Sequence, residues 1–217
     1  MSVSRAITGV NFSISSLCNL DCPDCCCDIP YRTSKSHVTW DYVVHAARFL
    51  TGLYKINITG GEPLGHPQFE EWAPKLKTLF GCEKLFTETN ALLARKRERA
   101  LEHFDFIHVS HYTPASYAQS SKEYRADNTA AVEWIRQRFP AKVVVGEMRH
   151  IPRETRRGTK PCPLATAPQV SYWDGLLYPC CVGPGVRTAK GIPLTENWRE
   201  EIQHILPPCA DCFYAEP

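Results

Sequence analysis

Short apolar runs alternate with amphipathic helical patterns through the first 150 residues of the chain. The apolar runs predict strands over residues 9–15, 55–59, 84–87, 104–110 and 142–147. The helical patterns predict helices over residues 39–53, 67–80, 91–103 and 128–139. In TWDYVVHAARFL, for example, Val43, Ala46 and Leu50 fall on one stripe, as in a helix that lies on a sheet. Repeated strand–helix units predict a parallel sheet with right-handed crossovers.

The number of these units sets the expected fold class. About five strand–helix units are too few for the eight strands of a closed barrel, so the pattern favours an α/β fold of the partial, open β/α TIM-like barrel type. In such barrels ligands bind at the carboxyl ends of the strands. A cysteine-rich segment directly follows the first predicted strand, and the sequence GGEP follows the second. Both sequences therefore fall where ligands are expected to bind.

The sequence changes character after residue 150. The segment IPRETRRGTKPCP is basic and rich in Pro, which is typical of a linker. SYWDGLLYP then predicts a hairpin of two short strands around Asp174-Gly175, because this dipeptide tolerates positive φ. A short helix over residues 196–205 precedes a final Cys-x-x-Cys. We therefore expect a barrel domain over residues 1–150 and a small C-terminal domain over residues 151–217.

Composition and charge exclude several classes of protein. The chain has 217 residues, of which 43% are hydrophobic and 22% charged, as in a globular protein. The formal net charge of +2 provides no strong field for binding nucleic acid or an anionic membrane. No apolar stretch approaches the ~20 residues that span a bilayer. The N-terminus lacks the pattern of a secretory signal, so a cytoplasmic location is expected.

Cysteine content departs from the ordinary composition. Eleven cysteines is an odd number, and without an export signal the chain does not resemble a secreted disulfide framework. In a reducing compartment, a cysteine-rich chain more often uses thiolates to hold metal. The cysteines form two groups separated by Cys82: Cys18, Cys22, Cys25, Cys26 and Cys27, then Cys162, Cys180, Cys181, Cys209 and Cys212. Two groups suggest two metal sites.

The first group contains three thiols at a compact spacing. Cys18, Cys22 and Cys25 follow one another at intervals of four and three residues, so a loop folded around a cluster can point all three inward. Three thiolates on a four-iron four-sulfur cubane leave one iron without a protein ligand, as a reactive cluster requires. The alternative is a zinc site, which needs a fourth ligand, with candidates His37, His45 and His66. Cys26 and Cys27 are either spare ligands or ordinary packed thiols.

This Cys-x3-Cys-x2-Cys spacing, followed by Gly60-Gly61-Glu62-Pro63 after the second strand, resembles the radical S-adenosylmethionine (SAM) superfamily over residues 8–150. The resemblance implies that the three cysteines ligate a 4Fe-4S cluster and that SAM chelates its open iron. It also implies that reductive cleavage of SAM produces a 5′-deoxyadenosyl radical, which abstracts hydrogen from substrate. By this resemblance the GGEP motif binds the methionine moiety. The residue before the third cysteine is usually aromatic in the family, whereas here it is Asp24.

The second group is similar to the twitch extension of some radical SAM enzymes, a shortened form of the SPASM domain. By that resemblance a second, auxiliary 4Fe-4S cluster is bound by four cysteines: Cys162, Cys180, Cys209 and Cys212. Cys181 competes with Cys180 for this role, and a structural zinc held by the same thiols is the alternative. A fully ligated cluster is suited to electron transfer, so the twitch resemblance implies oxidation of a substrate radical. Some relatives perform redox-neutral chemistry instead.

Several polar residues stand at the predicted strand ends. Asn90 lies in TETNA, similar to the family sequence TNG with alanine in place of glycine, and Ser110 resembles a position that contacts the SAM ribose or carboxylate. The candidate catalytic residues are Glu147, Arg149, His111 and Tyr112. None of them can be assigned as a general base from the sequence.

We therefore expect a radical SAM oxidoreductase with two 4Fe-4S clusters and SAM as cofactors. Its expected partners are a small-molecule, sugar-like or nucleotide substrate and a flavodoxin or ferredoxin as electron donor, with neither a membrane nor a nucleic acid as a partner. The alternatives are a peptide maturase, a redox-neutral rearrangement enzyme and, outside the enzymes, a zinc-binding interaction module.

Overall fold

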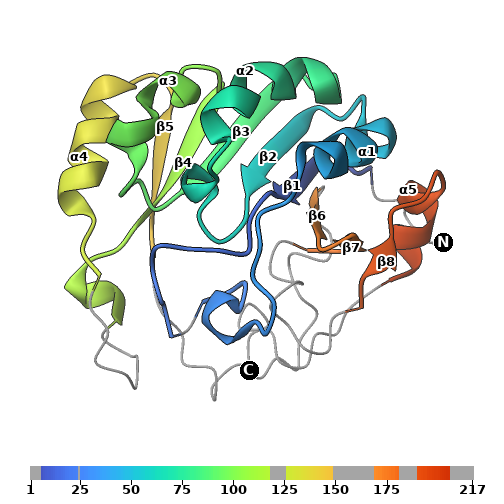
Figure 1. The fold of residues 1–217 in the computed structure, drawn as a ribbon, viewed down its shortest axis with the longest axis horizontal. Coiled ribbons are helices and arrows are strands. Elements are labelled where there is room, and N and C mark those ends of the chain that lie inside the picture. The colour runs from blue at the N-terminus through green and yellow to red at the C-terminus, as the bar shows by residue number, and fades with distance from the viewer. Residues whose placement is uncertain (1–5, 24, 118–125, 149–168, 181–189, 206–217) are drawn as a thin grey trace.

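The computed structural model describes residues 6–23, 25–117, 126–148, 169–180 and 190–205. Its centre is an eight-stranded sheet in the order β5-β4-β3-β2-β1-β6-β7-β8 (Figure 1). The strands are β1 (Gly9–Ser13), β2 (Lys55–Thr59), β3 (Lys84–Thr89), β4 (Phe106–His111), β5 (Val143–Glu147), β6 (Gln169–Trp173), β7 (Leu176–Tyr178) and β8 (Ile192–Pro193). Strands β1 to β6 are parallel, and the last two pairings are antiparallel. The predicted α/β class and the open, mostly parallel sheet are confirmed.

Helices cover one face of this sheet (Figure 1). They are α1 (Trp40–Leu50), α2 (Phe69–Phe80), α3 (Glu98–Leu101) and α4 (Thr129–Arg138), and a further helix, α5 (Trp198–Glu201), lies beside β8 at the end of the sheet. Short 3₁₀ turns occupy Ile29–Tyr31, Pro63–Gly65, Ala94–Arg97, Pro114–Tyr117 and Ile202–His204. Helix α1 shows why the elements form where they do. Its hydrophobic residues recur with the helical period, so Val43, Ala46 and Leu50 all lie on the buried stripe.

Alternation along the strands separates an apolar face from a polar one. The residues that pack under the helices are completely buried, as Ile56 and Ile58 show on β2. Since successive side chains of a strand point to opposite faces, the residues between them belong to the other face. That face, here called the open face, carries Asn57 and Thr59 on β2 and Glu88 on β3. A polar surface on the inside of a partial barrel provides hydrogen-bonding groups to a ligand.

The helix expected over residues 91–103 is wrong at its start. Residues 90–93 form a turn instead, and regular helix is confined to the 3₁₀ turn and α3. The side chains of Thr89 and Asn90 accept hydrogen bonds from the backbone of Ala91 (3.0 Å) and Leu92 (3.1 Å). Such local bonds offer the backbone an alternative to helix. Ala91 takes a left-handed φ of 61°, the conformation for which glycine would be favoured.

The C-terminal hairpin extends the main sheet. The predicted hairpin is present as β6 and β7, and β6 pairs in parallel with β1 from Gly9 to Phe12. Helix α5 also contacts the body of the protein, because the buried Trp198 donates from Nε1 to the carbonyl of Phe49 at 3.0 Å. The division into domains at residue 150 stays a prediction. In the part of the chain that the structure describes, no helix is long and apolar enough to cross a membrane.

Candidate functional site

The GGEP turn lies directly against the segment that leads into the cysteine loop. The amide of Gly61 donates to the carbonyl of Ser15 at 2.7 Å, and the amide of Glu62 donates to that of Leu17 at 2.9 Å. A Cβ atom on Gly61 would lie 2.3 Å from the Leu17 carbonyl oxygen, and one on Gly60 would lie 2.3 Å from that of Ser15. Only glycine permits this approach, so the two motifs are held together through backbone.

The three motif cysteines follow β1 in one loop. Cys22 is buried, while Cys18 and Cys25 are partly buried. Burial raises the pKa of the Cys18 thiol to about 12, and negative charge on Glu62 and Cys22 adds to the effect. Burial likewise raises the pKa of Cys25 to about 12, with further effects from Cys26 and Cys22. Since charge on Cys22 acts on both of the other thiols, the three sulfurs share one region of the structure.

The donor set of this loop consists of thiols, which are the ligands that iron–sulfur clusters take. Among the described residues, no three His, Cys, Asp or Glu side chains are grouped so that they could hold a metal ion. In a cluster each cysteine ligates a different iron, so the thiols need to surround the cluster and not converge on one point. His66 is a poor candidate for the fourth ligand of the alternative zinc site, because both of its ring nitrogens already have hydrogen-bond partners. These partners are the Val38 carbonyl (3.1 Å) and the Gln68 amide (3.2 Å).

Glu62 of the GGEP motif is buried, with 1% of its surface exposed. Its Oε1 accepts hydrogen bonds from the Leu64 amide (3.0 Å) and the Thr89 hydroxyl (2.6 Å), and its Oε2 accepts one from the Asn90 amide (2.8 Å). Burial nevertheless raises the pKa of Glu62 to about 7. Three of about four acceptor positions are thus taken by the protein. The carboxylate therefore joins the GGEP turn to the end of β3.

Asn90 connects the end of β3 to the cysteine loop. Its Nδ2 donates to Asn19 Oδ1 at 2.8 Å and lies 4.0 Å from the Cys18 sulfur. Ser110 is buried at the end of β4, the neighbouring strand. The structure thus brings the GGEP motif, Asn90 and Cys18 together at the carboxyl ends of the parallel strands, which form one edge of the sheet. Ser110 lies one strand away, on β4.

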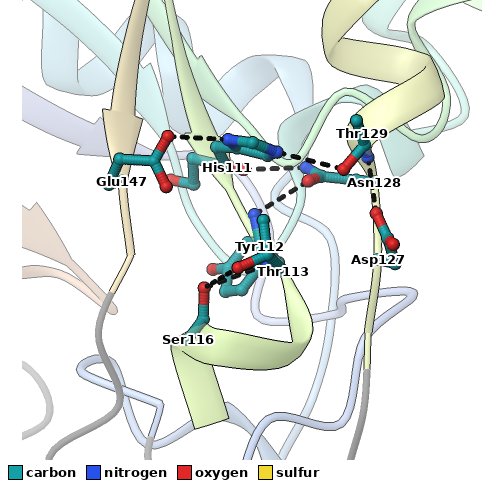
Figure 2. A network of polar contacts seen from close by, with 9 residues as sticks. His111, Tyr112, Thr113, Ser116, Asp127, Asn128, Thr129 and Glu147 are labelled. Atoms are coloured by element: carbon teal, nitrogen blue, oxygen red, sulfur yellow. Dashed lines mark hydrogen bonds and ion pairs between the residues drawn. The ribbon is translucent and has the colours of Figure 1, made fainter. Parts of the chain in front are cut away.

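Asn128 is a residue of this edge that the sequence analysis missed. Its Nδ2 donates to the carbonyls of Asn90 (2.6 Å) and Ser110 (2.8 Å). Its Oδ1 accepts from the Tyr112 amide at 2.8 Å, a contact that Figure 2 shows. In the sequence, Asn128 is simply the first residue of a predicted helix, where asparagine is a common cap. No signal in a single sequence distinguishes that role from a bridge between strands.

The candidate catalytic residues His111 and Glu147 pair with each other. His111 lies between Glu147 Oε1 (2.9 Å from Nδ1) and the Thr129 hydroxyl (3.2 Å from Nε2), as Figure 2 shows. By strand alternation both share a face with the buried Val109, which is the face that the helices cover. Tyr112 follows them at the end of β4, and its amide is bound by Asn128. Arg149 lies outside the described residues, as does Asp24.

A second histidine–carboxylate pair occupies the open face. His108 Nδ1 lies 3.4 Å from Glu88 Oε1, and the two residues are register partners on β4 and β3. Their side chains are 41% and 40% exposed, and the hydrogen bond that Glu88 accepts from the His108 ring raises the pKa of His108. His108 is not among the residues predicted for the site, because it lies inside a strand and not at its end. Alternation from the buried Ile107 would have placed it on this face.

The predicted auxiliary-cluster ligands are described only in part. Cys180 follows β7 and is buried, with 1% of its surface exposed. Cys162, Cys181, Cys209 and Cys212 lie outside the described residues. Of the remaining cysteines, Cys26 and Cys27 have their sulfurs 3.8 Å apart, and Cys82 is buried beneath α2, where its sulfur approaches the Lys77 carbonyl at 4.0 Å.

Comparison with known proteins bears on the N-terminal two thirds of the chain. The model of the family described as the Radical SAM superfamily matches residues 12–158, more than half of the chain. The chain is 33% identical over 103 residues to a GTP 3′,8-cyclase of Pelotomaculum thermopropionicum, covering 45% of this chain and 31% of that protein. It is also 33% identical over 106 residues to a probable GTP 3′,8-cyclase of Methanosarcina acetivorans, covering 45% and 30%. The matched part is thus about a third of the length of these curated relatives.

Solved structures show the same fold. The crystal structure of BtrN in complex with AdoMet and 2-DOIA superposes with a TM-score of 0.64 at 14% identity, covering 93% of this chain and 84% of that chain. A selenomethionine form of BtrN in an open conformation gives a TM-score of 0.55 at 13% identity, covering 91% and 79%. At such identities the likeness extends to the fold alone.

Proposed function

The chain belongs to the radical SAM superfamily, and we propose that it is an enzyme that cleaves SAM reductively and abstracts hydrogen from a small polar substrate. One observation carries the proposal. The GGEP turn is hydrogen-bonded through its backbone to the segment that enters the loop of Cys18, Cys22 and Cys25. A motif that binds methionine and a loop that holds a cluster must be adjacent if SAM is to reach both.

Each residue of this edge has a separate task in the proposed reaction. Cys18, Cys22 and Cys25 would hold a 4Fe-4S cluster. When bound, that cluster supplies one electron to the SAM sulfonium, giving methionine and a 5′-deoxyadenosyl radical that takes a hydrogen atom from substrate. Gly60 and Gly61 allow the backbone to approach closely, and their carbonyls are the groups that would orient the methionine moiety, since the Gly61 amide is already bonded to Ser15. A flavodoxin or ferredoxin is the proposed electron donor.

The proposed substrate is a small polar molecule or a nucleotide. The open face of the sheet supports this class, because Thr59, Glu88 and His108 offer hydroxyl, carboxylate and imidazole groups to a ligand. The curated relatives support a nucleotide in particular, since their name contains GTP. His111, Tyr112 and Glu147 remain candidates for proton transfer, with Arg149 as a candidate for binding an anionic group.

Two redox outcomes are proposed, each with its own support. Oxidation of substrate would use an auxiliary 4Fe-4S cluster held by Cys162, Cys180, Cys209 and Cys212, and it is supported by the burial of Cys180 beside a hairpin that extends the main sheet. A redox-neutral conversion is supported by the relatives, which are named as cyclases. The iron content of the reconstituted protein distinguishes two clusters from one, because two clusters hold about eight irons and one holds about four.

The primary test is the formation of 5′-deoxyadenosine. Anaerobically reconstituted protein is mixed with dithionite and SAM, and the products are separated by liquid chromatography. We expect the wild-type chain to form 5′-deoxyadenosine and Cys22→Ala to form none, since loss of one of three ligands releases the cluster. Cys82→Ala is the matched control, because Cys82 is also buried but lies under α2. Iron-loaded wild-type protein that forms no 5′-deoxyadenosine would overturn the proposal.

A second experiment addresses the substrate. Deuterated GTP and deuterated amino or hydroxyl compounds are each incubated with the reconstituted enzyme, and deuterium in 5′-deoxyadenosine is measured by mass spectrometry. Deuterium transfer from GTP would support a nucleotide as the substrate. Deuterium transfer from another compound would show that the substrate belongs to that compound's class instead. A Cys180→Ala variant that keeps about eight irons would contradict Cys180 as a ligand of the proposed auxiliary cluster and leave Cys181 in that role, whereas a wild-type chain with about four irons would contradict the cluster itself.

A further inference from the structure

We propose that Asn128 is a positioning residue for the SAM site, which acts by holding the carboxyl ends of β3 and β4 at a set spacing. The effect on SAM rests on the proposed function, whereas the effect on the strand ends rests on the structure alone. Asn128 stands before α4 and is 2% exposed. Its side chain contacts Asn90, which directly follows β3, and Ser110, which lies on β4.

Each polar atom of the Asn128 side-chain amide has a hydrogen-bond partner. Both hydrogens of Nδ2 have a carbonyl partner, at 2.6 Å on Asn90 and 2.8 Å on Ser110. The oxygen accepts from the Tyr112 amide at 2.8 Å. Rotating the amide by half a turn would place oxygen against two carbonyls and nitrogen against an N–H group, so only one orientation satisfies all three partners. Aspartate has the same shape but cannot donate to the two carbonyls.

Asn128 forms this bridge and does not cap the helix that it precedes. Its side chain makes no capping hydrogen bond to α4. Asp127 accepts from the Thr129 amide at 2.9 Å instead, and Figure 2 shows Asp127 on the far side of Thr129 from His111. Asparagine at such a position ordinarily serves the helix. In this protein Asp127 caps the helix and Asn128 forms the bridge. A substitution of Asp127 is therefore a matched control for a substitution of Asn128.

The bridge completes a series of hydrogen bonds that ends at the cysteine loop. The Asn90 amide donates to Glu62 at 2.8 Å, and the Asn90 carbonyl accepts from Asn128, so this residue is held on both sides. Its side chain, in turn, donates to Asn19 beside Cys18. Without Asn128 the Asn90 carbonyl and the end of β4 lose their common partner. The groups that would contact SAM then sample more positions, which weakens binding of SAM more than it slows its cleavage.

The experiment compares Asn128→Ala and Asn128→Asp with Asp127→Ala in the full-length reconstituted protein. The probe is SAM, and the readouts are KM and kcat for dithionite-driven SAM cleavage, the melting temperature, and amide hydrogen exchange over residues 89–93 and 110–113. We expect KM for SAM to rise at least about tenfold in both Asn128 variants with a smaller change in kcat. We expect faster exchange in both segments, and neither effect in Asp127→Ala.

The outcomes separate this proposal from the proposed function. A KM within about twofold of wild type together with unchanged exchange in the Asn128 variants would overturn the positioning role. An equal rise in KM and an equally faster exchange in Asp127→Ala would also overturn it. Such a result would show that any substitution at the start of α4 disturbs the site. If the wild-type chain does not cleave SAM, the proposed function fails, and exchange alone then decides whether Asn128 holds the strand ends. Asn128→Ser, whose hydroxyl keeps a donor for one of the two carbonyls and introduces no charge, serves if neither Asn128→Ala nor Asn128→Asp folds.

Discussion

Two kinds of polar site occur on and around strands β2 to β5. The buried frame consists of Glu62, Thr89, Asn90 and Asn128, whose side chains are enclosed and bonded to several partners each. The exposed pairs are Glu88–His108 and His111–Glu147, each joined by one contact between histidine and a carboxylate that is 40% or 68% exposed. A buried polar group is costly unless every partner is in place, so the frame can exist only in one arrangement. Exposed pairs contribute little and exchange partners with water.

This difference indicates a division of labour at the candidate site. The frame links the GGEP turn, β3 and β4, so it is suited to hold a cofactor in one position. Of the two pairs, Glu88–His108 lies on the open face with solvent-accessible atoms, so it is suited to meet a ligand, whereas His111–Glu147 lies on the face that the helices cover. Substitutions in the frame should therefore change stability and SAM cleavage strongly, whereas substitutions in the exposed pairs should change stability only slightly.

The largest effect is expected where the frame meets the cysteine loop. Gly61→Ala would place a Cβ atom 2.3 Å from the Leu17 carbonyl, so the GGEP turn and the loop must separate. We expect a loss of about 3 kcal/mol in the free energy of unfolding and no detectable 5′-deoxyadenosine. Denaturant unfolding and the SAM cleavage assay measure the two effects. Gly65→Ala is the control, since its nearest neighbour, Leu93 Cδ1, is 3.9 Å away; equal behaviour of the two variants would contradict this account.

An intermediate effect is expected from replacing the buried carboxylate. Glu62→Gln places an amide NH₂ group where a carboxylate oxygen now accepts a hydrogen bond from Asn90 or Leu64. We expect it to lower the free energy of unfolding at pH 8 by about 2 kcal/mol, because a buried donor loses its partner. Glu147→Gln makes the same chemical change at an exposed site and should cost less than about 0.5 kcal/mol. If both variants unfold at the same denaturant concentration, the contrast between frame and pairs is wrong.

The smallest effect concerns pH. Glu88 raises the pKa of His108 above its ordinary value of 6.5. A histidine whose pKa is raised by folding contributes stability that is fully present below pH 6.5 and is lost as the pH rises through the folded-state pKa. We expect less than about 1 kcal/mol from a pair this exposed. In Glu88→Gln, NMR titration should show a lower pKa for His108, and the difference in stability from wild type should shrink between pH 6 and 8. An unchanged titration would show that the pair does not form in solution.

Much of the fold follows from local pattern. The five parallel strands and the hairpin around Asp174-Gly175 appear in the sequence as apolar runs and a turn dipeptide, and the structure contains them. The prediction failed at residues 90–93, where the side chains of Thr89 and Asn90 bond to backbone that would otherwise start a helix. Composition gave no warning of this, because the same residues are compatible with a helix start.

The candidate site was predictable where chemistry requires a fixed residue type and spacing. Three cysteines and a Gly-Gly-Glu-Pro turn are recognisable in a linear chain, because the groups that they would bind allow few substitutes. The sequence by itself thus determined the superfamily, the class of sheet and the residues that define its ligand-binding edge.

Only the tertiary structure decided which polar residues hold that edge together. Asn128 meets Asn90 and Ser110 across 38 and 18 positions of sequence, and Glu88 meets His108 across two adjacent strands. Such contacts depend on strand order and register, which arise from the packing of the whole sheet. A local sequence pattern reports which face a side chain takes, whereas its partners are set by the elements that the fold brings beside it.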